Sequence, residues 1–132
     1  SGDYVDHFKA ILRTAVDDRL RTRCVALEMS GGLDSPSIAA TAKDILVERG
    51  EPFDIQAYTC VYDRLIPDRE RHFAGLVAQA LDIPINFVAL DDCALFESPI
   101  PGDVREPEPF FSYPESTAGA DFWKGAAARS RA

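Results

Sequence analysis

The sequence Ser-Gly-Gly-Leu-Asp-Ser at residues 30–35 is the stretch that decides the fold of this chain. It follows a short apolar run at residues 24–27 and directly precedes Pro36 and a helical pattern. A strand, a tight glycine turn and a helix start in this order build an anion cradle. Adjacent glycines let the backbone come close to an anion, and the helix presents free N–H groups and its positive dipole end. Residues 30–35 therefore predict a phosphate-binding loop at the carboxyl end of a strand.

The side chains of this loop fit the same prediction. Ser30 and Ser35 supply hydroxyl donors, and Asp34 supplies an oxygen ligand suited to Mg²⁺. The alternative is a plain surface turn in which Asp34 only caps the following helix. The loop is not a Walker A loop, because no Gly-Lys-Ser/Thr follows, and it lacks the GxGxxG pattern. A P-loop NTPase and a dinucleotide-binding fold are therefore both disfavoured.

Outward from the loop, apolar periodicity predicts helices and strands in alternation. We expect an amphipathic helix over 3–22, a strand over 24–29, a helix over 36–49 that ends at Gly50, and a strand over 53–62. A helix over 68–81 and a strand over 85–90 follow. The second strand should place Ile55, Ala57, Thr59 and Val61 on one face, and the third helix should carry Phe73, Leu76, Val77 and Ala80 inward.

This order of elements predicts an α/β fold, with a parallel sheet and right-handed crossovers in a three-layer α/β/α arrangement. After Asp92 the pattern changes. Residues 98–117 form a proline-rich stretch that reads as a loop, and a last helical stretch covers about 118–132. The acidic pair Asp91-Asp92 is expected to end the third strand and face solvent.

The composition is that of one globular domain of 132 residues, with 46% hydrophobic and 27% charged residues. A net charge of −8 argues against a nucleic-acid binder, and no apolar run is long enough to span a bilayer. The three cysteines, Cys24, Cys60 and Cys93, have neither zinc spacing nor the pattern of a disulfide framework. Cys24 and Cys60 are expected to act as small buried hydrophobes in a reducing, cytoplasmic setting.

The loop resembles the pyrophosphate loop of the N-type ATP pyrophosphatases. The strand that runs into it, residues 37–40 after it, and the stretches 62–70 and 81–84 are similar to the synthetase domain of glutamine-dependent asparagine synthetase. Relatives that close lactam rings, the β-lactam synthetases and lasso-peptide cyclases, are also similar, especially in Tyr-Asp-Arg-Leu-Ile-Pro-Asp at 62–68. The resemblance covers roughly residues 3–92, and the chain has Pro36 where the family usually has Ser.

The resemblance implies an adenine nucleotide α-hydrolase-like fold, ATP and Mg²⁺ as cofactors, and amide formation. ATP would adenylate a carboxylate, aspartate by family default, and an amine or ammonia would attack with release of AMP and pyrophosphate. Ser30, Gly31, Gly32 and Ser35 would hold the pyrophosphate, and Asp34 would bind Mg²⁺. Catalytic residues are not assigned.

Adenine would lie over the carboxyl ends of the first two strands, the expected site in a doubly wound sheet. The candidates are Leu27, Met29, Thr59, Cys60 and Val61, mainly through their backbone, although Leu27 and Val61 also fit a purely structural role. Asp68 and Glu70 either complement the dipole of the third helix or face the nucleotide, as the family's acidic pair does.

The remaining expectations concern partners and extent. In the family, a further strand and a second Gly-Asp loop follow at about this distance, so the chain looks like the N-terminal part of such a domain, truncated and inactive alone. A glutaminase domain or protein is the expected partner, and an uncovered sheet edge favours a homodimer. A ring-closing cyclase and a degenerate nucleotide-binding module without catalysis are the alternatives to asparagine formation.

Overall fold

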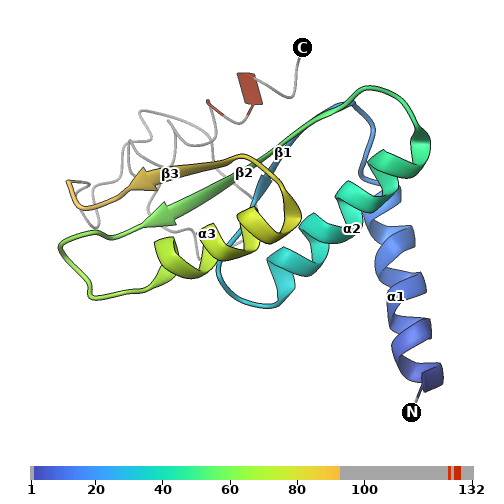
Figure 1. Ribbon diagram of the computed structural model, residues 1–132, viewed down its shortest axis with the longest axis horizontal. Helices are drawn as coiled ribbons and strands as arrows, with labels where there is room; N and C mark the ends of the chain where they lie inside the picture. The colour runs from blue at the N-terminus through green and yellow to red at the C-terminus, as the bar shows by residue number, and fades with distance from the viewer. Residues whose placement is uncertain (1, 93–124, 126, 129–132) are drawn as a thin grey trace, which may run out of the picture.

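The computed structural model describes residues 2–92, 125, 127 and 128 (Figure 1). Its elements are α1 (Gly2–Asp17), β1 (Cys24–Glu28), α2 (Asp34–Arg49), β2 (Asp54–Val61), α3 (Glu70–Leu81) and β3 (Ile85–Ala89). The proline-rich stretch 98–117, Cys93 and most of the last predicted helix lie outside the described residues. No helix in the described part of the chain is long and apolar enough to cross a membrane.

The three strands form one parallel sheet in the order β1-β2-β3. Leu27 of β1 pairs with Ala57 of β2, and Ala57 in turn pairs with Ile85 of β3. Each strand is joined to the next by a helix, as parallel pairing requires. The predicted α/β class with a parallel sheet is confirmed.

Helices α2 and α3 cover one face of this sheet (Figure 1). Alternate residues of β2 point to that face, where Ile55 and Ala57 join the main core. Thr59 and Val61, on the same side of the strand, are buried as well. Helix α2 contributes Ala39, Ala42, Ile45 and Leu46 to the core, and it ends at Gly50, which adopts the left-handed conformation at φ 68°.

The opposite face of the sheet carries a smaller apolar cluster. Tyr58 is buried there with Ala26, Cys60 and Val88 packed around it. Helical residue Gly125 lies against this cluster, because a Cβ added to it would come 3.9 Å from Cε1 of Tyr58. Described helical residues thus lie on both faces of the sheet, as in a three-layer α/β/α fold.

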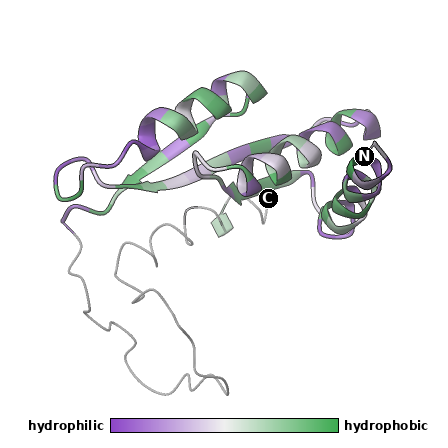
Figure 2. Cartoon of the chain, turned by 90° about the horizontal axis from the view of Figure 1, so that it is seen from below, coloured by the Kyte–Doolittle hydropathy of each residue, from purple (hydrophilic) through white to green (hydrophobic). Residues whose placement is uncertain are grey.

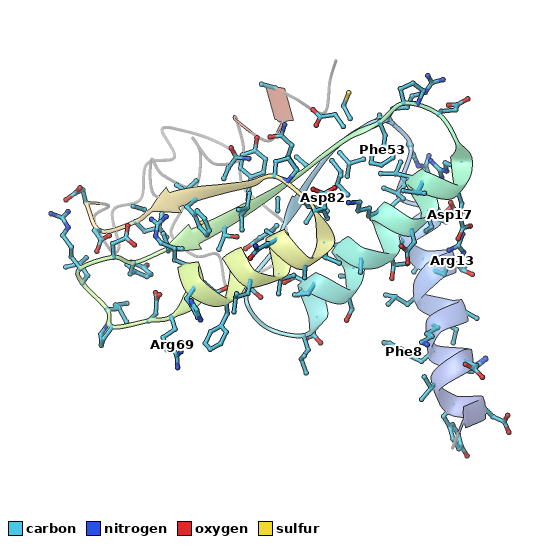
Figure 3. The ribbon with its side chains drawn as sticks, viewed as in Figure 1. Phe8, Arg13, Asp17, Phe53, Arg69 and Asp82 are labelled. Carbon is cyan, nitrogen blue, oxygen red and sulfur yellow. The ribbon has the colours of Figure 1, made fainter. Side chains whose placement is uncertain are left out.

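Helix α1 is shorter than its apolar pattern predicts, since it ends at Asp17 rather than near residue 22. The chain turns instead, and Leu20 reaches the core through the turn. Arg49 of α2 stabilises that turn, with Nη1 donating to the carbonyl of Leu20 at 2.9 Å and Nη2 to Asp17 at 2.8 Å. Figure 3 shows Asp17 on the part of α1 beside α2.

The first half of α1 extends away from the sheet (Figure 1), and Figure 2 shows both hydrophobic and hydrophilic residues along the helix. Its apolar side chains are exposed. Tyr4 and Phe8 are 83% and 62% exposed. The predicted amphipathic helix is therefore present. Among the described residues, its apolar side chains pack on the hydrophobic core only from Leu12 onward.

The prediction of which α3 residues face the core is wrong in part. Phe73 and Leu76 are 40% and 50% exposed and Ala80 is also exposed, whereas Ala74 and Ala78 are the buried residues of the helix. Val77 packs on the core as predicted. Small side chains face inward because this helix lies close to the sheet and to the connection between β1 and α2.

Candidate phosphate-binding site

The glycine loop begins where β1 ends, beside the last residues of β2. The N–H of Met29 donates to the carbonyl of Tyr58 at 2.9 Å. The hydroxyl of Thr59, which is 2% exposed, donates to the carbonyl of Met29. Met29, the residue just before Ser30, is thus bonded to β2 through both its N–H and its carbonyl, which fixes the start of the loop.

Within the loop, hydrogen bonds join the side chains of Ser30 and Ser35 to each other and to the loop backbone. The N–H of Ser30 donates to Oγ of Ser35 at 2.8 Å, and the two hydroxyl oxygens lie 2.9 Å apart. The N–H of Gly32 donates to Oγ of Ser30 at 3.2 Å. The structure thus brings together the two serine hydroxyls that the sequence assigned to pyrophosphate.

Gly31 faces α3 and is in close contact with it. Its N–H donates to Oε1 of Glu70 at 2.5 Å. A Cβ at Gly31 would overlap Cβ of Phe73 and would lie 3.2 Å from the N atom of Ala74. The described glycine with positive φ is Gly50, so Gly31 is needed for close approach rather than for an unusual backbone angle.

Helix α2 begins directly at the loop. Asp34 is its first residue and is exposed, and no side-chain hydrogen bond caps the helix. The N–H groups of the first turn are the ones that an α-helix leaves without an internal acceptor, and they carry the positive end of its dipole. The hydroxyl of Ser37 is used otherwise, because it donates to the carbonyl of Leu33 at 2.6 Å.

A single exposed carboxylate fits Mg²⁺ that is mainly held by water and phosphate oxygens. The described residues contain no group of three metal-ligating side chains. Asp34 therefore fits a metal that arrives with a nucleotide, and a metal held by protein ligands alone would need more donors than these residues offer. Its role as a ligand stays a prediction.

The residues predicted to line the adenine lie at one end of the sheet, but their side chains point in different directions. Met29 and Val61 are fully buried, and Leu27 packs against the core. Cys60 is half-buried on the opposite face of the sheet, beside Tyr58. Contacts from Met29 and Val61 to a nucleotide would have to come from their backbone, as the sequence prediction supposed.

The loop between β2 and α3 is fixed by a carboxylate that sequence reasoning missed. Asp91, just after β3, accepts hydrogen bonds from the N–H groups of Asp63, Arg64 and Leu65 at 2.8, 2.7 and 2.8 Å. These backbone donors hold the pKa of Asp91 below its usual value. Asp91 was expected to face solvent, but it is half-buried and anchors this loop. The only sequence signal is an acidic residue at the end of the next parallel strand.

The start of α3 is held in place by two further contacts. Arg71 donates from Nε and Nη2 to the carboxylate of Asp63 at 2.8 and 2.7 Å, and its guanidinium lies 4.6 Å from the centre of the Phe87 ring. The hydrogen bonds from Arg71 lower the pKa of Asp63. Arg69 lies over its own neighbour on the helix, Phe73, at 4.7 Å from the ring centre, and points away from the sheet (Figure 3).

The sequence left two roles open for Asp68 and Glu70, the acids at the start of α3. In the structure these two side chains make different contacts. Asp68 accepts the N–H of Glu70 at 3.0 Å and the N–H of Tyr62 at 3.3 Å, so it shapes the turn that begins the helix. Glu70 instead reaches across to the glycine loop. Of the pair, only Glu70 contacts the candidate site in the described residues.

The geometry defines a class of protein: a parallel α/β domain with a serine- and glycine-containing loop between its first strand and the following helix. The family model for asparagine synthase matches residues 7–115, and the chain belongs to this family. It therefore carries an asparagine synthetase-type synthetase domain, from a family of ATP-using, amide-forming ligases. No curated protein matches the chain.

Proposed function

We propose that this chain binds ATP with Mg²⁺ through residues 30–35 and is the nucleotide-binding portion of a synthetase that adenylates a carboxylate. When bound, ATP supplies the AMP group that activates the carboxylate and the pyrophosphate that leaves. Attack by ammonia or another amine on the activated carboxylate then forms the amide and releases AMP. Aspartate is the carboxylate that the family's default chemistry favours.

One observation carries this proposal: the position of the glycine loop between the carboxyl end of β1 and the amino end of α2. The hydroxyls of Ser30 and Ser35 lie together there, beside the first turn of a helix of sixteen residues. Hydroxyls, backbone N–H groups and a helix dipole are the donors that neutralise a phosphate without a basic side chain. An acidic chain can therefore bind ATP locally, with Mg²⁺ balancing the remaining charge.

Calorimetric titration of the chain with Mg-ATP tests the proposal, with the variants Asp34→Ala and Asp44→Ala beside the wild type. Both residues are exposed and lie on α2, so each variant removes one negative charge from the same helix. Their positions differ by ten residues, which is about 15 Å along the helix axis. Mg-ATP binding that is lost in Asp34→Ala and kept in Asp44→Ala supports a metal role for Asp34.

Two outcomes would count against parts of the proposal. Equal affinity in wild type and Asp34→Ala would remove the metal role and leave Asp34 as a first-turn acid. Absence of binding to the wild type at millimolar Mg-ATP would argue against nucleotide binding by this chain and favour a purely structural module.

Four finer statements complete the proposal. Ring closure to a lactam is the alternative to asparagine formation, favoured by the resemblance of residues 62–68 to the cyclases. A glutaminase domain or protein would supply ammonia in the first case, and a homodimer would cover the sheet edge. The cysteine usage favours a cytoplasmic setting.

A further inference from the structure

We propose that Glu70 is a positioning residue for the glycine loop, holding Gly31 against α3 so that the loop keeps its shape before a nucleotide binds. That this loop shape serves nucleotide binding rests on the function proposed above. The contact itself rests on the structure alone. Neither the family match nor the sequence pattern assigns this role to Glu70.

The first observation is the hydrogen bond from the N–H of Gly31 to Oε1 of Glu70, 2.5 Å long and formed between two half-buried residues. A hydrogen bond to an ionised carboxylate is shorter and stronger than one between neutral groups. It joins positions that are 39 residues apart in the sequence. It therefore fixes the loop relative to α3, which no bond within the loop can do.

The second observation is the packing of Gly31 on the same helix. A Cβ at Gly31 would overlap Cβ of Phe73 and would lie 3.3 Å from its carbonyl carbon and 3.2 Å from the N atom of Ala74. Glu70, Phe73 and Ala74 are three and four residues apart, so they share one face of α3. One helix face thus provides both the acceptor for the Gly31 N–H and the surface on which Gly31 rests.

These contacts decide which loop groups are left for phosphate. The N–H of Gly31 is engaged with Glu70 and that of Gly32 with Oγ of Ser30, and one of the two serine hydroxyls donates to the other. The donors that remain in the loop are the second serine hydroxyl and the N–H groups of the first turn of α2. The carboxylate of Glu70 extends from α3 and meets Gly31 on the side of the loop that packs on this helix. The opposite possibility is that Glu70 occupies the phosphate position and must be displaced by ATP.

Two variants of the full chain separate these possibilities. Glu70→Gln keeps a carbonyl oxygen that can accept the Gly31 N–H but removes the charge, whereas Glu70→Ala removes the acceptor. The test is to measure the hydrogen exchange of the Gly31 amide by NMR and the Kd of Mg-ATP by calorimetry for each variant. The amide of Ala57, which donates to the carbonyl of Pro84 at 2.8 Å in the core, reports whether the fold is intact. Asp44→Ala controls for a change of one charge far from the loop.

Positioning predicts faster exchange of the Gly31 amide in Glu70→Ala, by about tenfold or more, with Ala57 unchanged. Mg-ATP should bind about tenfold more weakly to Glu70→Ala and within about threefold of wild type to Glu70→Gln, because the glutamine restores the acceptor.

Unchanged Gly31 exchange in Glu70→Ala would overturn the proposal whatever the nucleotide does. Tighter Mg-ATP binding by both variants would overturn it too, and would show that the carboxylate competes with phosphate. If the wild type binds no Mg-ATP, the proposed function fails, yet the exchange rates still decide whether Glu70 holds the loop.

Discussion

Replacing Gly31 by alanine is the sharpest test of how the loop and α3 fit together. The added Cβ would overlap Cβ of Phe73 and lie 3.2 Å from the N atom of Ala74. Both are atoms of the helix framework, so no flexible side-chain end can swing away. Overpacking of this kind costs about 1–3 kcal/mol, and the lower entropy of the unfolded chain with alanine returns about 0.4–1 kcal/mol. We therefore expect a net loss of about 1–2 kcal/mol in the free energy of unfolding.

Urea unfolding measures this loss as a lower midpoint with an unchanged slope. Gly75→Ala is the matched control, because Gly75 lies in α3 and a Cβ there would meet only Cζ of Phe87 at 3.9 Å among its neighbours within 4 Å. Alanine is favoured over glycine inside a helix by about 0.8–1 kcal/mol, so this variant should be more stable than the wild type.

The two glycine variants should therefore change stability in opposite directions. Phe73→Ala should not rescue Gly31→Ala, because alanine keeps the Cβ that overlaps. A Gly31→Ala protein as stable as the wild type, or a rescue by Phe73→Ala, would refute the reasoning from close approach.

Three other predictions concern single contacts. Gly50→Ala should lower the free energy of unfolding by about 1 kcal/mol in urea titration, because the residue has φ 68° at the end of α2. Thr59→Val should cost about 1 kcal/mol in the same assay, since it leaves the carbonyl of Met29 without its buried donor. The pKa of Asp91 is lowered in the folded state, so its contribution to stability is full above the unfolded pKa and is lost as pH falls through the folded one. Stability should thus decrease below about pH 4, and Asp91→Asn should flatten that part of the profile when urea midpoints are compared across pH.

The periodicity of the sequence predicted the order of strands and helices because the strands and the helices carry local signals. Residues 24–27 form a short apolar run, and Gly50 marks the end of α2. Such signals depend on neighbours in the chain alone. The end of α1 was missed because a long-range contact determines it: Arg49 bonds the carbonyl of Leu20 and draws the chain into a turn.

The inward face of α3 could not be read from hydrophobicity for a similar reason. Phe73 and Leu76 are the more apolar residues, but Ala74 and Ala78 are buried because the helix lies too close to its neighbours for larger side chains. Where two backbone segments lie close together, the size of a side chain decides whether it can be buried between them. The distance between segments is a property of the tertiary structure, which a residue pattern does not contain.

The same distinction separates the two glycines of the loop, which the sequence presents as equivalent. A Cβ at Gly31 would meet the framework of α3, whereas a Cβ at Gly32 would meet only the hydroxyl of Ser30, at 3.3 Å. Gly32 is exposed and its nearest neighbour is a side chain that can rotate. Close packing on α3 therefore requires glycine at position 31, whereas no comparable contact requires it at position 32. The two adjacent glycines of the motif thus differ in their surroundings, since Gly31 packs on α3 while Gly32 is exposed.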